Sequence, residues 1–335
     1  MSLNPNKYAT VVIPAAYTPR WLQICVSSFA KYKNEKDFNI LVMNNSPDFP
    51  MIEAISQTEL IGHVDHIAIT PYAQDRGHGL SLDYAIELVN TPFFFATETD
   101  GRPLRDGWLD WFAAFMKDDE VAMAGWLWEQ APDIDDGRKY ISPGGTLYNT
   151  KILKLLKREC QRNKSHTICY GANNLRRHEI EGIYHELLDR GSFGPFTDCR
   201  GFHNLYPINK QWKEDWWWHE PGSWCYFRAL CQWECVKVPG AMVYHENPHV
   251  ADYTYYGDKE NPWFYHQWAG TVSHNFDKHL VGTPWEIECI EWWLRREYRI
   301  WEEVVPENVR QVSIEKGLVK NFDDELAYAL SRVQR

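Results

Sequence analysis

The sequence has little that would place the chain in a membrane or on nucleic acid. No apolar stretch is long enough to cross a bilayer, and we expect neither a transmembrane segment nor a secretory leader. The formal net charge is −11, whereas a nucleic-acid-binding protein would present a basic face. The charge therefore predicts no nucleic-acid partner, although one local site can still be positive enough for a small phosphate-bearing ligand.

The cysteines form no recognisable framework. There are eight of them, without a CxxC pair or a regular spacing. Cys225, Cys231 and Cys235 lie close together, but without a second cluster they make a poor zinc site. Free and mostly buried thiols fit a reducing compartment, so we expect a cytoplasmic protein.

Tryptophan, by contrast, is abundant. The chain has 17 Trp residues, and several are clustered. Most are expected to be structural, in the core and at helix contacts. A minority could bind carbohydrate, because the flat apolar faces of sugars stack on aromatic rings.

Strands and helices alternate along the first hundred residues. Residues 8–14, 39–43 and 93–96 have the apolar composition of buried strands, and a further short strand is expected to end near Ile69. Helices are predicted between them, the first of them beginning at Thr18-Pro19. The alternation predicts an α/β fold with a mostly parallel sheet flanked by helices.

The remainder is less regular. Residues 121–128 are predicted to form a strand, Pro143-Gly144-Gly145 a turn, and residues 233–245 a strand, turn and strand. The C-terminal part is expected to be helical, because Thr283-Pro284 has the form of a helix start and apolar residues follow at helical spacing. A last helix is predicted over 320–333.

An acid pair directly follows the strand at 93–96. Glu98 and Asp100 are brought to a loop beyond a strand's carboxyl end, where open α/β sheets bind ligands. Two such carboxylates suit a hard divalent ion that also holds a diphosphate. The plainer interpretation is a strand-end turn with two solvated acids, since short motifs often match by chance.

Two distal segments add candidates. His245 closes an apolar strand and could complete a metal shell with the acid pair, although a structural histidine is the commoner case. The segment 215–224 combines acids with aromatic rings. Glu220 there suits a general base, with Asp215 as the reserve, and four Trp residues could line an acceptor site: Trp216, Trp217, Trp218 and Trp224.

Four motifs in sequence order resemble the GT-A-fold glycosyltransferases of the large family 2 type. VVIPAAYTPRWL resembles the opening strand and turn of that family, and LVMNNSPD resembles its second strand and loop. GHGLSLDYAIELVNTPFFFATETDG resembles its helix–strand–DxD block. GSWCYFRALCQWECVKVPGAMVYH resembles its segment with an acidic residue, an arginine, a valine–proline strand and a histidine. Together the motifs cover roughly residues 8–250.

The resemblance implies a nucleotide-sugar donor site, a catalytic metal and inversion at the anomeric centre. The implied metal is Mn²⁺ or Mg²⁺ on Asp100, with His245 and Glu98 as further ligands, and Glu220 is the implied base. The donor site would be formed by the following residues: Ala15, Ala16, Tyr17, Asn44, Asp83, Glu98, Asp100, Gly144 and Gly145.

The chain departs from the family pattern at several positions. Asn44 stands where an Asp usually contacts the nucleotide base, which leaves the nucleotide open. Asp83 replaces an Asn, and Glu98 replaces the first Asp of the DxD motif. The acid ahead of Arg228 is offset from its usual spacing, so the resemblance leaves the choice of base between Glu220 and Asp215 open.

The sequence therefore predicts a metal-dependent glycosyltransferase that moves a sugar from a nucleotide-sugar to a carbohydrate or other hydroxyl acceptor. Residues 1–250 would form the GT-A domain, with a nucleotide-binding half over 1–101 and an acceptor half over 102–250. Residues 251–335 would be a mainly helical extension that binds acceptor, covers the site or forms a homodimer. A nucleotidylyltransferase and a non-catalytic carbohydrate-binding protein are the alternatives.

Overall fold

The structure is a computed structural model. It describes residues 3–16, 19–33, 37–45, 51–70, 78–129, 139–163, 174–176, 216–218, 223–230, 232–244, 251–267 and 284–333. Four residues to which the sequence analysis assigns roles lie outside this part of the chain: Tyr17, Asp215, Glu220 and His245.

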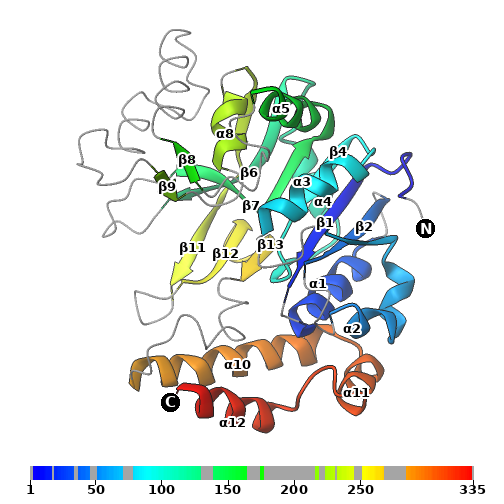
Figure 1. The fold of residues 1–335 in the computed structure, drawn as a ribbon, viewed down its shortest axis with the longest axis vertical. Helices are drawn as coiled ribbons and strands as arrows, with labels where there is room; N and C mark the ends of the chain where they lie inside the picture. The colour runs from blue at the N-terminus through cyan, green and yellow to red at the C-terminus, as the bar shows by residue number, and fades with distance from the viewer. Residues whose placement is uncertain are drawn as a thin grey trace.

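A seven-stranded sheet forms the centre of the described fold (Figure 1). Its strand order is β10-β6-β7-β4-β1-β2-β3. Strand β1 pairs in parallel with both β2 and β4, β2 with β3, and β6 with β10, while β7 runs antiparallel to β4 and β6. The strands have these bounds: β1 Ala9–Ala15, β2 Phe38–Asn44, β3 His66–Ile69, β4 Phe93–Ala96, β6 Val121–Glu129, β7 Lys139–Asn149 and β10 Glu234–Lys237.

The continuous apolar composition of the first strands follows from burial on both faces. In β1, Val11 and Ile13 belong to one buried cluster, whereas Val12 between them belongs to another. Successive side chains of a strand point to opposite faces, so each face of the sheet has its own core. Strands covered on both sides need apolar residues at every position rather than at every second one.

Helices cover both faces and create these two cores (Figure 1). One face packs against α1 (Pro19–Lys31) and α4 (Trp108–Ala113), and α10 (Pro284–Val304) packs in turn on α1. The other face packs against α3 (His78–Leu88), α5 (Thr150–Asn163) and α8 (Ser223–Leu230). Short helical turns, α2 (Glu53–Ser56) and η1 (Glu59–His63), lie between β2 and β3. The predicted α/β class, a mostly parallel sheet flanked by helices, is confirmed.

A second, four-stranded sheet adjoins the first, with the order β11-β12-β13-β5. It consists of β5 (Gly101–Pro103), β11 (Gly240–Tyr244), β12 (Ala251–Gly257) and β13 (Pro262–Gln267). Its pairs are all antiparallel. Because β12 and β13 belong to this sheet, a domain division that kept the sheet whole would fall after Gln267. A separate two-stranded ribbon joins β8 (Asn174–Arg176) to β9 (Trp216–Trp218).

The turn predicted at Pro143-Gly144-Gly145 is wrong. These residues lie inside β7. Gly145 has a φ of 144°, and a Cβ on it would come within 2.7 Å of the Tyr256 hydroxyl. The glycines therefore allow close packing of β7 against the small sheet, which sequence alone does not distinguish from a turn.

Three helices end the described chain: α10, α11 (Glu307–Glu315) and α12 (Phe322–Val333). Helices α10 and α12 are joined to α1 by what we call the Arg20 cluster, which consists of Arg20, Glu297, Tyr298 and Glu325. The Arg20 side chain is buried and donates to Glu297 at 2.8 Å, to Tyr298 at 2.8 Å and to Glu325 at 2.9 Å.

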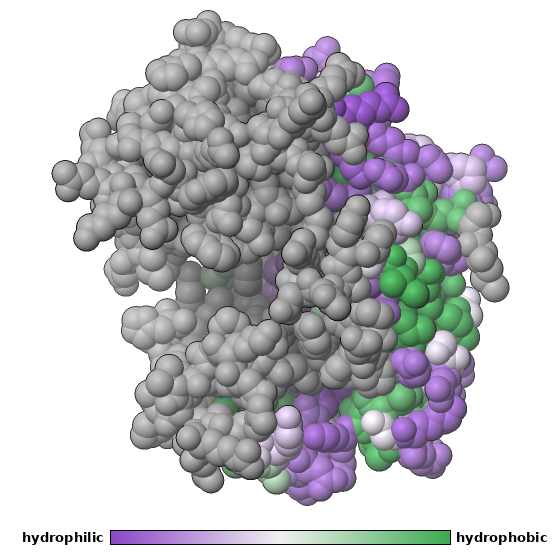
Figure 2. Space-filling view, in the orientation of Figure 1, coloured by the Kyte–Doolittle hydropathy of each residue, from purple (hydrophilic) through white to green (hydrophobic). Residues whose placement is uncertain are grey.

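The outer surface of the C-terminal helices is polar. Figure 2 shows mainly hydrophilic residues, with some hydrophobic ones between them, along the lower edge of the molecule, where Figure 1 draws α11 and α12. Most positions of these two helices are exposed or half-buried. Within the described ranges, no helix combines the length and the apolar composition that a bilayer crossing would need.

Candidate metal centre

The acid pair lies in a tight turn between the two sheets. Strand β4 ends at Ala96, and the Thr97 N–H still donates to the Val12 carbonyl at 3.2 Å. The Gly101 N–H then donates back to the Glu98 carbonyl at 3.0 Å and begins β5. A Cβ at Gly101 would lie 2.0 Å from the Thr97 Oγ1, so this turn requires glycine directly after Asp100.

A histidine from β13 completes the group. Strand β13 pairs antiparallel with β5, which places His266 opposite Gly101, and the Gln267 N–H donates to the Asp100 carbonyl at 2.9 Å. The His266 Nε2 lies 3.3 Å from Asp100 Oδ1 and 3.4 Å from Glu98 Oε2. We call these three residues the acid–histidine triad. Their potential ligand atoms all lie within 4.8 Å of one another.

The triad is largely removed from solvent, except at Glu98. Asp100 and His266 are 6% and 2% exposed, whereas the Glu98 side chain is 35% exposed. Burial by itself lowers the pKa of His266, but the carboxylates of Asp100 and Glu98 outweigh it and raise the pKa to about 10. Burial and the same two carboxylates raise the pKa of Tyr256 above its usual range. The ion-free site therefore holds two carboxylates around one imidazolium.

Strand β7 forms one wall of the triad. A Cβ on Gly144 would lie 2.5 Å from the Cε1 atom of His266, so only glycine leaves space for the ring. The Tyr256 hydroxyl donates to the Gly144 carbonyl at 3.2 Å. Gly144 and Gly145, which the family resemblance assigns to the donor site, thus lie directly beside the metal-ligand candidates.

The other predicted donor residues lie at the same edge of the main sheet or beside it. Ala15 ends β1 and is paired with Asn44 at the end of β2, and Ala16 follows immediately. Asn44 is 3% exposed, and its carbonyl accepts from the Thr70 N–H at 3.0 Å. Asp83 is buried on α3. The carboxyl ends of parallel strands are where α/β sheets bind ligands.

The aromatic segment is only partly described. Trp216, Trp217 and Trp218 form β9 and pair with β8, and Trp224 lies in α8. Their proposed contact with an acceptor stays a prediction. So do the roles of Asp215, Glu220, Tyr17 and His245, which lie outside the described residues.

His266 is the functional candidate that sequence reasoning missed. One local signal was present, since Phe264 and His266 occupy alternate positions of PWFYHQ and so share one face of a strand. The structure shows that both side chains are buried. A buried histidine at a core-facing strand position needs a polar partner. The sequence gives no sign that β13 pairs with β5, and it is this pairing that supplies Asp100 as that partner.

Scans against protein-family models and against curated proteins find no match. Among solved structures, part of the chain is similar to S. aureus TarS in complex with UDP-GlcNAc, at 12% identity and a TM-score of 0.35, covering 47% of this chain and 48% of that chain. It is also similar to Mycobacterium tuberculosis glucosyl-3-phosphoglycerate synthase in complex with Mn²⁺, UDP and glucosyl-3-phosphoglycerate. There the identity is 11% and the TM-score 0.36, covering 45% of this chain and 60% of that chain.

The similarity spans about half the length of these solved chains. Likeness with TM-scores near 0.35 and so few identical residues is too weak to assign an activity to this chain. What the protein does has to be inferred from its own strand order and from the acid–histidine triad.

Proposed function

We propose that the chain is a metal-dependent glycosyltransferase that moves a sugar from a nucleotide-diphosphate sugar to an acceptor hydroxyl, with inversion. The observation that carries this proposal is the convergence of Glu98, Asp100 and His266 on one point. That point follows the carboxyl end of β4, and Asn44 ends the nearby strand β2. An open α/β sheet binds nucleotides at this edge.

The triad fits a divalent ion by its donor chemistry and its spacing. Ligand atoms held about 2.1 Å from one ion lie about 3.0–3.4 Å apart in octahedral or tetrahedral geometry. The observed separations of His266 Nε2 from the two carboxylates, 3.3 and 3.4 Å, match that spacing. Two carboxylates with one imidazole suit Mn²⁺ better than Mg²⁺, which prefers an all-oxygen shell.

The bound ion would neutralise the negative charge that develops on the diphosphate leaving group. Asp100 would hold that ion from a buried position, and the more exposed Glu98 would face the ion or the ribose. In the transfer itself, the acceptor oxygen bonds to the anomeric carbon while the bond from that carbon to the diphosphate oxygen breaks. The proton of the acceptor hydroxyl passes to Glu220, or to Asp215 if that residue is the base.

The remaining roles complete the proposal. Ala15, Ala16, Tyr17, Asn44 and Asp83 would bind the nucleotide, and Gly144 and Gly145 would line the sugar side. The tryptophans at 216–218 and 224 would orient the acceptor by stacking. His245 remains a prediction as a further ligand. A homodimer through the C-terminal helices also remains a prediction, which the sedimentation coefficient of the full chain would test.

Release of nucleoside diphosphate tests the proposed activity. A panel of nucleotide-sugars is first screened by thermal shift with and without Mn²⁺, because a ligand that binds the native state raises its melting temperature. The stabilising donor is then incubated with Mn²⁺, and free nucleoside diphosphate is measured. Release of pyrophosphate from a nucleoside triphosphate and a sugar phosphate would indicate a nucleotidylyltransferase. Saturable sugar binding without any release would indicate a non-catalytic protein.

The choice of base needs its own experiment. General-base catalysis contributes about 10²–10⁴-fold, so Glu220→Gln should lose turnover on that order while still binding donor. Asp215→Asn in the same assay is the matched comparison. A large loss in the Asp215 variant alone would move the role there, and small losses in both would place the base outside residues 215–224.

A further inference from the structure

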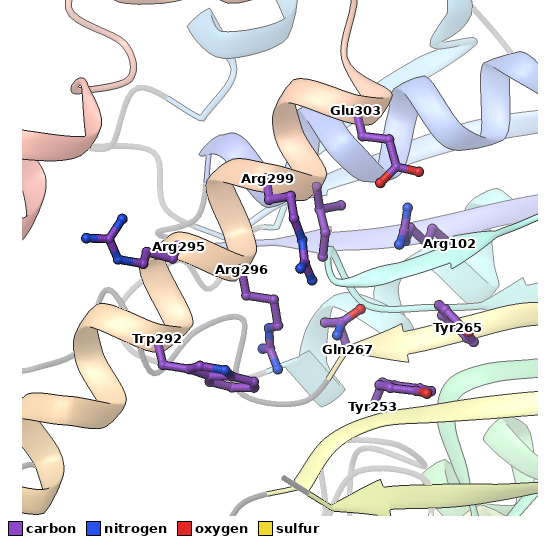
Figure 3. Close-up of a pocket in the computed structure, with 10 residues that line it drawn as sticks. Arg102, Tyr253, Tyr265, Gln267, Trp292, Arg295, Arg296, Arg299 and Glu303 are labelled. Carbon is purple, nitrogen blue, oxygen red and sulfur yellow. The ribbon is translucent and has the colours of Figure 1, made fainter. Parts of the chain in front are cut away.

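A cavity lies on the opposite face of the small sheet from the triad. It has a volume of about 380 Å³, within the range of about 300–1,000 Å³ that is typical of small-molecule sites. Helix α10 forms one side, and β12, β13 and β5 form the other (Figure 3). Because side chains alternate along β13, His266 faces the triad while its neighbours Tyr265 and Gln267 line this cavity.

The lining is strongly basic in an otherwise acidic protein. Arg102 comes from β5, and Arg295, Arg296 and Arg299 come from α10, against the single acid Glu303. Figure 3 shows Arg296 and Arg299 extending from α10 toward Gln267, whereas Arg295 extends to the other side of the helix. The whole chain has a formal charge of −11, so this is a local concentration of positive charge with the form of an anion site.

Burial of part of the Arg102 side chain in the cavity wall costs free energy. Its Nε atom is buried and makes no hydrogen bond to any part of the chain that the structure describes. Burial lowers the pKa of Arg102, Glu303 opposes that shift, and Arg299 adds to it. Arg102 as a whole is half-buried. A partly desolvated guanidinium next to another positive charge is stabilised when an anion enters the space between them.

Aromatic rings fix the arginines and offer flat apolar surface. The rings of Tyr253 and Tyr265 are 4.7 Å apart, and the Arg102 guanidinium carbon lies 5.8 Å from the Tyr265 ring centroid. The Arg296 guanidinium carbon lies 4.8 Å from the Trp292 ring centroid. A guanidinium stacked on a ring still presents its N–H groups at the edge, where they can bind anionic oxygens.

We propose that this cavity binds a small organic phosphate, with the phosphoryl group between Arg102, Arg296 and Arg299 and a ring against Tyr253, Tyr265 and Trp292. A phosphoryl group is favoured over a lone carboxylate because its three terminal oxygens and nearly two negative charges match three guanidinium groups. The rings fit the flat face of a sugar. This inference does not depend on the proposed transferase activity, since the cavity and the triad lie on opposite faces of the sheet.

Calorimetric titration of the full chain with glucose 6-phosphate tests the inference. The titration is done in EDTA, so that no metal can draw phosphate to the triad, with inorganic phosphate and neutral glucose as further probes. We expect saturable binding of glucose 6-phosphate, weaker binding of inorganic phosphate and none of glucose. Absence of phosphate binding at millimolar concentrations, or equally strong binding of glucose, would overturn the proposal.

Variants locate the site. Arg299→Gln changes an exposed side chain and should weaken glucose 6-phosphate binding about tenfold or more, because a charge-assisted hydrogen bond is lost. Lys316→Gln is the control for the loss of one positive charge, since Lys316 is exposed on the segment after α11, and it should leave the affinity unchanged. Circular dichroism melts confirm that both variants are folded.

A second basic cavity is an alternative place where phosphate could bind, and a variant there can contradict the proposal. It lies at the start of α5 and includes Lys151, Lys154 and Arg158. If Lys154→Gln weakened phosphate binding while Arg299→Gln did not, the anion would bind there and the proposal would be wrong. Equal affinity in all variants would likewise overturn it.

Discussion

The acid–histidine triad and the Arg20 cluster each place two carboxylates around one buried basic side chain. Their contacts differ. In the Arg20 cluster, the guanidinium donates to Glu297 at 2.8 Å and to Glu325 at 2.9 Å, and its carbon lies 4.0 Å from the Tyr298 ring centroid. In the triad, the imidazole nitrogen stays 3.3 and 3.4 Å from the carboxylates.

The difference separates a structural ion pair from a candidate binding site. Arginine remains charged at any physiological pH and holds both acids of the Arg20 cluster by direct hydrogen bonds. Histidine can lose its proton and become a metal ligand, and the wider spacing of the triad matches ligands around one ion. Two carboxylates around one basic side chain can therefore stabilise the fold in the Arg20 cluster and form a candidate metal site in the triad.

Replacement of Asp100 should give the largest effect of all the predicted changes. Asp100→Asn removes the buried carboxylate ligand, so we expect Mn²⁺-dependent donor binding and turnover to be abolished. The measurement is nucleoside diphosphate release together with Mn²⁺ titration by calorimetry. Asp323→Asn, at an exposed acid in the first turn of α12, is the matched control. Full activity in the Asp100 variant would remove the basis for the proposed metal centre.

Loss of Arg20 should affect stability rather than metal binding. Arg20→Met leaves Glu297 and Glu325 buried without their partner, and breaking a buried pair in this way costs about 3–5 kcal/mol. Urea unfolding would measure the loss. Arg295→Gln breaks an exposed pair with Glu291 on α10 and should cost no more than about 0.5 kcal/mol. Similar losses in both variants would mean that the Arg20 cluster does not stabilise the fold.

The protonation of His266 should be visible in the ion-free protein. Its folded pKa of about 10 lies above the ordinary value of about 6.5, so its stabilising contribution is complete below pH 6.5 and is lost as pH rises toward 10. The slope cannot exceed about 1.4 kcal/mol per pH unit for one proton. Denaturant melts in EDTA across this range should show it, and His266→Asn should remove it.

Proton release on Mn²⁺ binding is a second test of the protonation of His266. A neutral imidazole ligand must give up its proton, so Mn²⁺ binding near pH 7.5 should release up to one proton per ion. Calorimetry in buffers of different ionisation enthalpy measures that number. His63→Asn, at an exposed histidine, should leave the proton release unchanged. Proton release that persists undiminished in His266→Asn would exclude His266 as the ligand.

The smallest predicted effect concerns the wall of the triad. Gly144→Ala places a Cβ 2.5 Å from the His266 ring, so the ring must shift and Mn²⁺ affinity should fall about tenfold, as it does when groups that orient a ligand are changed. Gly62→Ala is a suitable control, because a Cβ there meets nothing within 4 Å. An unchanged Mn²⁺ affinity in Gly144→Ala would show that His266 does not need its present position.

The first half of the fold follows closely from sequence patterns. Strands β1, β2 and β4 lie within a residue or two of their predicted bounds, and α1 begins at Pro19. The apolar runs are long and uninterrupted, because burial on both faces leaves no polar positions in them. The placement of Glu98 and Asp100 after β4 could be predicted for the same reason, since a polar stretch after a buried strand has to leave the sheet.

The small sheet could not be predicted in the same way. Strands β12 and β13 contain polar and aromatic residues side by side. A turn that begins at Gly257-Asp258 joins them into a hairpin, but no local motif pairs that hairpin with β5. Antiparallel pairing between β13 and β5 joins residues about 160 positions apart, and nothing local records such a contact. The sequence predicts a turn at the glycines of β7, because glycine is common in turns. In the structure these glycines lie within a strand and allow it to pack closely against the small sheet.

The sequence by itself determined the α/β class, the positions of the first strands along the chain and the position of the acid pair, since these depend on local hydrophobic periodicity. The tertiary structure alone decided that His266 meets Glu98 and Asp100, and that arginines from β5 and α10 surround one cavity. In each case the physical reason is the same. A binding site joins side chains from distant strands and helices, and sheet pairing and helix packing, rather than local propensity, determine which of them meet.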